Sequence, residues 1–348
     1  MMLLKPDGKI DLEYRATFLR STSHESVVIA VGQCGQFSVL SPGMKESRMP
    51  RLPSKIRAIS PHPSDRRLAF VDGNTGSLII QEFDGARLLE IAPLQVLDPK
   101  TSWIQRGFDD CFFSECGSFL WTIAPLNSED AVVQLHEAET GVVIDTATVK
   151  DPFGGSSCSF HSTGKSDLIC LWLAAGNPDM VQVYWLKTTR SGFTCTLEAQ
   201  LRNAIPPIFS PSGDELLVVT ADSAICKFTF PAMQQVGLPL KSVDNEDNPF
   251  AESPCYFSNR QALASTNEQR IFAVDTVRME IETEVSLEGH EPRPIGQYYP
   301  RLSKETGLGT DISCFTRLGD VIVFVYRRDR NAGLEEWQDS LLWLRARS

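Results

Sequence analysis

The sequence lacks the features of several common protein classes. No apolar run approaches the roughly 18 residues that a membrane-spanning helix needs, and the opening "MMLLKPDGKIDLEY" is too weakly apolar for a signal peptide. No Asn-x-Ser/Thr sequon occurs anywhere in the chain. The nine cysteines form no Cys-x-x-Cys pair, and Cys111, Cys158 and Cys255 stand in Cys-x-Phe, as small core residues would. These absences favour a reducing compartment, so we expect a cytoplasmic protein, with the nucleus as the second choice.

Common motifs of catalysis and of cofactor or metal binding are also missing. The five histidines have no spacing typical of a metal site, and neither an HExxH motif nor a P-loop lysine motif is present. The segment "GGSSCS" (154–159) comes near the G-x-S-x-G motif of serine hydrolases but lacks its final glycine. We therefore predict no catalytic residues, no metal and no cofactor.

The net charge argues against a further class of partner. The 33 lysines and arginines against 44 aspartates and glutamates give a formal charge of −11. A surface of this sign repels the phosphates of nucleic acids and anionic lipids. We therefore expect neither nucleic acid nor a membrane as the main partner.

What the sequence does contain is a repeated unit of short strands and turns. In "IFSPSGDELLVVTADSAICKFTF" (208–230), one strand ends at Phe209-Ser210, a turn follows, and two further strands are predicted at 216–220 and 225–230. The same order recurs at 111–141, 255–277 and 58–85, and more weakly at 15–43, 158–187 and 313–326.

One residue of each copy, the residue that ends its first strand, marks the period. These residues are Phe18, Ile59, Phe113, Phe160, Phe209, Phe257 and Phe315, separated by 41, 54, 47, 49, 48 and 58 residues. A period near ~45 residues built from four short strands is typical of propeller blades. We therefore predict an all-β fold, a seven-bladed β-propeller of four-stranded antiparallel blades in which residues 1–348 form a single domain. We also expect Phe113, Phe209, Phe257 and Phe315 to be buried equivalents.

Strand spacing alone also fits two other folds, a β-sandwich and a pair of stacked β domains. The repeated order of the elements, and not only their spacing, favours the propeller. A helical fold is excluded, because no long segment keeps a period of about 3.6 residues.

The repeats resemble those of WD-repeat β-propellers over essentially the whole chain. That family places an Asp in the turn before the third strand, which Asp130 and Asp222 match, and closes that strand with Trp-Asp. Here the closing positions hold His136-Glu137, Phe228-Thr229, Val274-Asp275 and Phe83-Asp84, and a single Gly289-His290 precedes the seventh blade. The chain is thus similar to a divergent member, of a kind found at the ends of large fungal proteins. The resemblance implies an incomplete hydrogen-bonded tetrad in each blade, with apolar packing holding most blades.

The last blade lacks a fourth strand at the end of the sequence. Residues 339–346, "DSLLWLRA", are predicted to be its third strand. The apolar segment Met1–Lys5 can fill the open position and so hide an exposed sheet edge. We therefore predict closure of the propeller by the N-terminal strand, with a disordered terminus as the alternative.

Four long insertions, at 93–107, 239–253, 288–310 and 327–338, lie either between a fourth strand and the first strand of the next blade or between a second and a third strand. In a propeller these two kinds of loop share a face. Long loops on a rigid scaffold often carry binding residues, and Trp, Tyr and Arg dominate interface energetics. The candidate partner-binding residues are therefore Trp103, Arg106, Phe250, Tyr298, Tyr299, Arg301 and Trp337. Aromatic side chains that fold back on their own loop are the alternative.

Two charge runs lie in or beside the same loops. "DNEDNPFAE" (244–252) has four acids and no base, and "RRDR" (327–330) has three arginines against one aspartate. They are either solvated loops or a bipolar surface that orients a protein partner.

Together these features predict an interaction scaffold that binds a protein or peptide partner on its long-loop face. The alternative is a propeller enzyme, a hydrolase or isomerase, with a small-molecule site at the central channel. Such an enzyme needs acids or histidines at the starts of first strands, and the sequence offers only Asp109 and Asp110 there.

Overall fold

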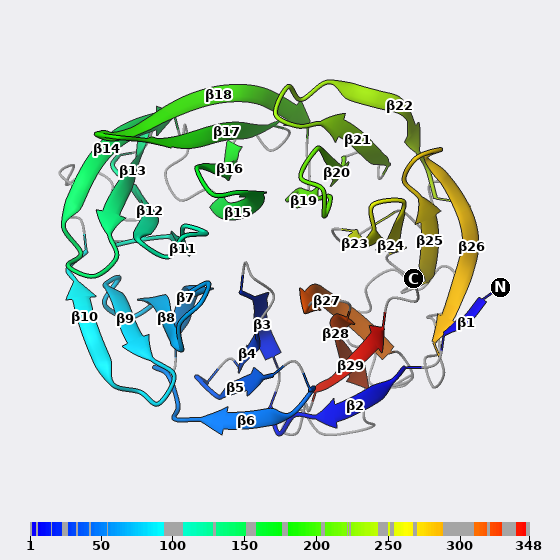
Figure 1. Cartoon of the computed structure of the whole chain (residues 1–348), viewed down its shortest axis with the longest axis horizontal. Helices are drawn as coiled ribbons and strands as arrows, with labels where there is room; N and C mark the ends of the chain where they lie inside the picture. Colours follow the sequence, from blue (N-terminus) through cyan, green and yellow to red (C-terminus); the bar gives the residue numbers. More distant parts are fainter. Residues whose placement is uncertain are drawn as a thin grey trace. The chain divides into compact units, whose positions relative to one another are not determined.

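The structure is a computed structural model of the chain, and it describes most of the sequence (Figure 1). The described residues are 2–4, 6–14, 16–22, 27–32, 34–41, 43–53, 55–93, 107–127, 130–150, 158–175, 180–202, 206–220, 222, 224–242, 250, 254–266, 270–287, 310–318, 321–328 and 339–345. Within them every regular element is a β-strand, and the strands form seven sheets built on four antiparallel strands each. The fold is the predicted seven-bladed β-propeller, in which each sheet is one blade.

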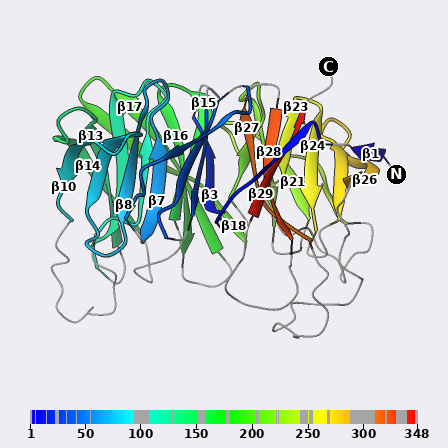
Figure 2. The same cartoon turned by 90° about the horizontal axis from the view of Figure 1, so that it is seen from below.

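Contacts divide the chain into two compact units, Met1–Leu19 with Ile205–Ser348, and Arg20–Ala204. Four blades lie wholly or mostly in the second of these units. Blade one holds β3 (Ala16–Ser21), β4 (Val28–Gly32), β5 (Phe37–Leu40) and β6 (Glu46–Met49), and blade two holds β7 (Ile56–Pro61), β8 (Arg67–Asp72), β9 (Leu78–Glu82) and β10 (Arg87–Ile91). Blade three holds β11 (Asp110–Phe113), β12 (Phe119–Pro125), β13 (Asp130–Glu137) and β14 (Val143–Lys150), and blade four holds β15 (Cys158–Lys165), β16 (Leu168–Ala175), β17 (Met180–Thr189) and β18 (Gly192–Arg202). Figure 2 shows their strands side by side, with β7 beside β8 and β13 beside β14.

Three blades lie in the other unit. Blade five holds β19 (Ile208–Phe209), β20 (Glu215–Val219), β21 (Ile225–Thr229) and β22 (Gln235–Leu240), and blade six holds β23 (Cys255–Ser258), β24 (Gln261–Ser265), β25 (Ile271–Asp275) and β26 (Glu280–Leu287). Blade seven holds β27 (Thr310–Leu318), β28 (Val321–Arg328), β29 (Asp339–Arg345) and β2 (Gly8–Asp11). A further strand, β1 (Met2–Leu4), belongs to the sheet of blade six.

Strand composition follows the position of each strand within its blade. The second strands are short apolar runs, and every residue of Val28–Gly32 is buried, because neighbouring elements cover both faces of the sheet. The fourth strands alternate, and β14 shows exposed residues at most of its positions. A blade is therefore apolar in its middle strands and polar at its outer edge.

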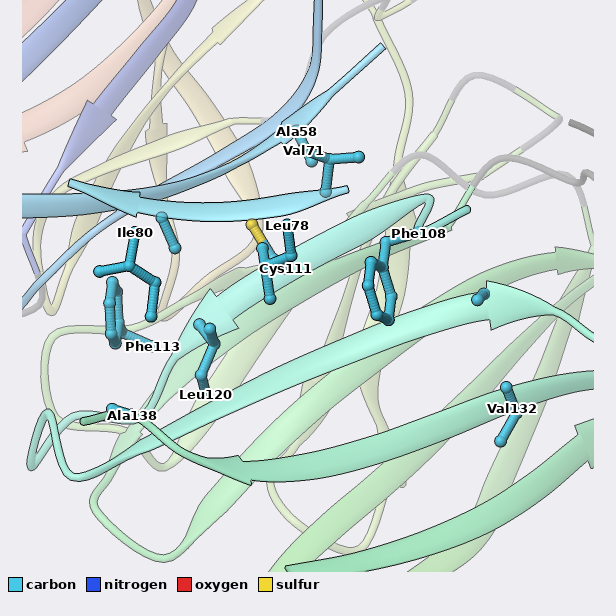
Figure 3. Packing of buried hydrophobic residues seen from close by; sticks show 12 residues of the cluster. Ala58, Val71, Leu78, Ile80, Phe108, Cys111, Phe113, Leu120, Val132 and Ala138 are labelled. Carbon is cyan, nitrogen blue, oxygen red and sulfur yellow. The ribbon is translucent and has the colours of Figure 1, made fainter. Parts of the chain in front are cut away.

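Side chains from blades two and three interlock in one buried cluster, which Figure 3 shows from close by. Leu78 and Ile80 of blade two face Phe113 and Leu120 of blade three, and each of the four is at most 2% exposed. Burial of this kind stabilises a fold by roughly 1.5–3 kcal/mol per large aliphatic or aromatic side chain. Apolar packing therefore holds these two blades together, as the divergent repeats implied.

The N-terminal part closes the last blade, but with a different segment from the one predicted. In blade seven, β2 pairs antiparallel with β29 and supplies the fourth strand. The predicted segment, Met1–Lys5, lies elsewhere, because β1 adds in parallel to β26 as a fifth strand of blade six. The prediction that Met1–Lys5 completes the last blade is therefore wrong, because Gly8–Asp11 does so. The prediction that an N-terminal strand closes the propeller is confirmed.

The residues that mark the blade period are not equally buried. Ile59, Phe113 and Phe160 are covered, with 5%, 2% and 5% of their surface exposed, whereas Phe18, Phe209 and Phe257 are only partly buried. The expectation that Phe209 and Phe257 match Phe113 is therefore wrong. Because β19 has only two residues, Phe209 ends a very short strand, where its ring meets Phe230 edge-on at 5.2 Å.

In blade three the position of the family's Trp is occupied by His136, which is completely buried. The Thr122 hydroxyl donates to its Nε2 (3.0 Å), and its Nδ1 donates to the carbonyl of Gly141 (3.1 Å). Burial lowers the pKa of His136, so the ring is neutral. The turn residue Asp130 accepts hydrogen bonds from Lys150 (2.8 Å) and Asn127 (3.0 Å) instead. Blade three thus has two separate sets of polar contacts, one around His136 and one around Asp130.

Candidate functional site

Connections into blades two and three lie against turns between second and third strands. The amide of Gly73 donates to the carbonyl of Lys55 (2.8 Å). Just after the insertion 93–107, the amide of Phe108 donates to the carbonyl of Gly76 (3.1 Å). Within this unit, the end of the long loop therefore lies beside a second-to-third-strand turn, which is the arrangement that the long-loop face requires.

Most of the predicted partner-binding residues lie outside the described part of the chain. These are Trp103, Arg106, Tyr298, Tyr299, Arg301 and Trp337, and their role stays a prediction. Phe250 is described and is only 3% exposed. It forms an isolated bridge with Thr266, and its ring meets Phe272 edge-on at 6.4 Å. Phe250 is thus an aromatic residue packed against its own blade, and we leave it out of the proposed surface.

The acidic pair at the start of β11 serves contacts within the fold. Asp109 forms an ion pair with Arg57 (3.2 Å), which also donates to the carbonyl of Phe108 (2.8 Å). The Asp110 carboxylate accepts the amides of Phe160 in blade four (2.8 Å) and of Cys111 (2.9 Å). Burial nevertheless raises the pKa of Asp110 to about 7. Both carboxylates therefore connect the start of β11 to neighbouring strands, Asp109 through Arg57 and Asp110 through Phe160. Each carboxylate oxygen of Asp110 accepts one hydrogen bond.

A serine–histidine pair on β15 is the arrangement nearest to a nucleophile with its base. Ser159 Oγ and His161 Nε2 are 2.7 Å apart, and both side chains are partly buried. Burial lowers the pKa of His161 to about 3, and the charge of Arg20 acts in the same direction. An effective general base titrates near the working pH, so an imidazole with this pKa is too weak a base to activate the serine at neutral pH.

Other kinds of site were sought among the described residues. No group of three or more His, Cys, Asp or Glu side chains there is placed to hold a metal ion. No helix long and apolar enough to cross a membrane occurs in that part of the chain. Eight of the cysteines there form no disulfide. The polar side chains discussed above thus make hydrogen bonds and ion pairs within the fold.

Solved structures share this architecture. The β-propeller domain of Cps50 (Swd1) from Myceliophteria thermophila superposes with a TM-score of 0.59, over 96% of this chain and 99% of that domain, at 12% sequence identity. The likeness shows the fold. It confirms the interpretation of the repeats as propeller blades, and at this identity it carries no activity or partner across. No protein-family model and no curated protein sequence matches the chain.

Sequence reasoning missed the pairing of Ser159 with His161. The signal was available, because the two residues flank Phe160 and must point to the opposite face of the strand from it. It also missed four exposed aliphatic residues, which are Leu88 on β10, Val142 just before β14, and Val143 and Ile144 on β14. The signal there was the apolar run "GVVI" (141–144) at the start of a strand that should be polar.

Acidification tests the state of His161. In the folded protein this imidazole stays neutral down to about pH 3, whereas in the unfolded chain it binds a proton near its usual pKa of 6.5. The unfolded state therefore binds more protons between these values, and stability falls as the pH falls, by up to about 1.4 kcal/mol per pH unit. His161→Gln removes the group that binds this proton in the unfolded chain. The variant should therefore lose less stability than the parent between pH 6.5 and about pH 4, measured by urea titrations.

The opposite sign is expected for Asp110. Its folded pKa of about 7 lies above the ordinary value of 3.8, so the folded state binds more protons between those values and gains stability as the pH falls. Asp110→Asn should therefore steepen the loss on acidification, where His161→Gln flattens it. Equal pH slopes in the parent and both variants would contradict the two assignments.

Proposed function

We propose that the chain is a non-catalytic interaction module that binds a protein or peptide partner on its long-loop face. That face comprises residues 93–107, 239–253, 288–310 and 327–338, without Phe250. The contact between Phe108 and Gly76, which sets the end of the first insertion beside a second-to-third-strand turn, is the observation that supports it most. Propellers lend themselves to this use, because long loops on a rigid scaffold can vary without loss of the fold.

The cytoplasm is the proposed location, with the nucleus as the second choice. Thiols scattered through the core suit a reducing compartment, and eight of the described cysteines form no disulfide. A net charge of −11 favours a protein partner over nucleic acid or an anionic membrane.

The enzyme alternative has weaker support. It requires a base and a nucleophile at the first strands of the blades. Among the described residues His161 has a pKa of about 3, and the oxygens of Asp110 already accept two amides. His161 is therefore too weak a base at neutral pH. The pKa of Asp110, about 7, would suit a general acid or base, but each of its two carboxylate oxygens already accepts a backbone amide within the fold.

Alanine at Trp103, Tyr299 and Trp337 together should weaken partner capture while leaving the melting temperature nearly unchanged. Each aromatic anchor of an interface is typically worth about 2 kcal/mol, so loss of all three removes most of a moderate affinity. The measurement is recovery of partners from a host lysate by the immobilised protein, with thermal melting run in parallel.

The matched control is Leu238→Ala with Val277→Ala, two aliphatic residues that are 84% and 56% exposed and lie outside the long loops. This control should capture partners as well as the parent does. Equal capture by the triple variant and the parent would refute the surface. A fall in melting temperature that matches the fall in capture would show that the three aromatics pack their own loops.

A further inference from the structure

Four aliphatic side chains on or next to the outer strands of blades two and three face solvent. Val142, Val143 and Ile144 are consecutive and are 60%, 44% and 40% exposed, and Leu88 is 49% exposed. Single exposed apolar residues are ordinary, but three in a row at the entry to an outer strand are not, unless they serve a contact. We name Leu88, Val142, Val143 and Ile144 the rim patch.

The two parts of the rim patch belong to segments that touch. The turn between β13 and β14 lies directly on β10, since a Cβ added at Gly141 would be 2.8 Å from Leu89 Cδ2 and 3.0 Å from Ile91 Cδ1. Gly141 has φ +71°, and its lack of a side chain permits this approach. Val142 follows Gly141 and Leu88 precedes Leu89, so the two exposed residues lie on either side of this contact between the blades.

The residue type at the register shift of the fourth strand differs among the blades, and blade five carries Leu238, which is 84% exposed, within its own shift. Leu88 of β10 and Ile144 of β14 are each the extra residue at a register shift of the fourth strand. The same position in blades four and six holds Glu198 and Glu282, which are exposed. Charged residues at an outer edge keep it soluble and unpaired. Two adjacent blades therefore carry apolar side chains where other blades of the same chain carry carboxylates.

Charges around the rim patch are mostly negative. On the same two blades, Asp65 and Glu139 share Arg67, Arg87 pairs with Glu90, Glu137 accepts from the Thr140 hydroxyl, and Asp145 accepts the Phe193 amide. Among these interacting groups the carboxylates outnumber the guanidinium groups. An apolar centre with an acidic surround complements a segment that combines aliphatic and basic side chains.

We propose that the rim patch is a second docking surface, which takes a partner segment with aliphatic residues flanked by lysine or arginine. The aliphatic side chains cover Leu88 and Ile144, and the basic side chains meet the surrounding carboxylates. This surface shares no residue with the long-loop face, so an experiment that refutes one of the two proposed surfaces leaves the other proposal standing.

Binding of a short synthetic peptide that alternates isoleucine with lysine tests the proposal, with a counterpart in which glutamate replaces lysine. The decisive variant is Leu88→Glu with Ile144→Glu, which installs the residue type that blades four and six carry at this position, so the fold should be kept. It removes apolar contact but adds negative charge. Docking on the patch predicts that the lysine peptide binds the variant about tenfold more weakly than the parent. Attraction by net charge alone predicts tighter binding to the variant.

A matched control adds the same charge elsewhere. Leu238→Glu with Val277→Glu also replaces two exposed aliphatic residues by glutamate, outside the patch. It should bind the lysine peptide at least as tightly as the parent does, and the glutamate peptide should bind none of the three proteins. Three outcomes would overturn the proposal: unchanged or tighter binding of the lysine peptide by the patch variant, equal binding of the two peptides by the parent, or a parent dimer in sedimentation that the patch variant abolishes, since a second copy would then be the occupant.

Discussion

Trp121→Ala will lower the free energy of unfolding by about 3–5 kcal/mol, the usual range for removal of a large aromatic side chain from a core. Trp121 lies in β12 with none of its surface exposed. It belongs to the buried cluster that blades three and four share, and its ring meets Phe193 of β18 edge-on at 4.9 Å. Alanine leaves a cavity that two sheets cannot close without breaking their register. Urea denaturation monitored by circular dichroism measures the loss.

The indole nitrogen of Trp121 makes the comparison with phenylalanine informative. Its N–H has no hydrogen-bond partner among the described residues. An unpaired buried donor is costly, so Trp121→Phe removes an unfavourable group together with part of the packing. We expect Trp121→Phe to cost clearly less than Trp121→Ala. A loss below about 1 kcal/mol for the alanine variant would mean that the two blades do not pack through this residue.

The sequence allowed the number of blades to be predicted because the repeated middle strands are buried on both faces. Runs such as Leu216–Val219 are apolar without interruption, and all four of these residues are buried. Turns between them are marked by Gly, Pro and Asp, whose preferences are local. Both signals come from short-range chemistry, so they are readable in one sequence.

The fourth strands were the least predictable part of the fold. Gly8–Asp11 reads "GKID", less apolar than "MMLLK", yet it is the strand that completes blade seven. An outer strand contributes backbone hydrogen bonds while one of its edges faces water, so hydrophobicity is a poor guide to it. The rim patch could not be predicted for a related reason. Leu88 and Ile144 lie at register shifts of the fourth strands, and these shifts depend on strand pairing that no sequence pattern shows.

Candidate site residues divide in a similar way. Phe250 was selected as an aromatic in a polar, Pro-rich loop, but its ring lies against Phe272. The residue type alone does not say which way a loop side chain turns, because that depends on distant residues that meet it. The chemistry of Asp110 and His161 was equally hidden, since their pKa values follow from burial between elements that are far apart in sequence.

Deletion of residues 1–11 should destabilise the protein far more than deletion of residues 1–5. The shorter deletion removes β1, a three-residue strand added to blade six. The longer deletion also removes β2, whose pairing with β29 covers Gly8 to Asp11. It further removes the bonds from the Asp7 amide to the Trp343 carbonyl (2.9 Å) and from the Ser340 hydroxyl to Asp11 (2.6 Å). At about 1 kcal/mol for each net hydrogen bond, loss of the strand should cost on the order of 5 kcal/mol.

Thermal melting of the two truncated proteins gives the comparison. For a chain of this size, a loss of about 5 kcal/mol corresponds to a fall in melting temperature of roughly 10 °C or more, whereas loss of β1 should change it by only a few degrees. Gly8→Val tests the same pairing without shortening the chain, because a Cβ at Gly8 would overlap the Trp343 ring. This variant should resemble the longer deletion. A fall of only a few degrees for both deletions would show that β2 does not hold blade seven. A fall of roughly 10 °C or more for both deletions would show that Met1–Lys5 has the closing role.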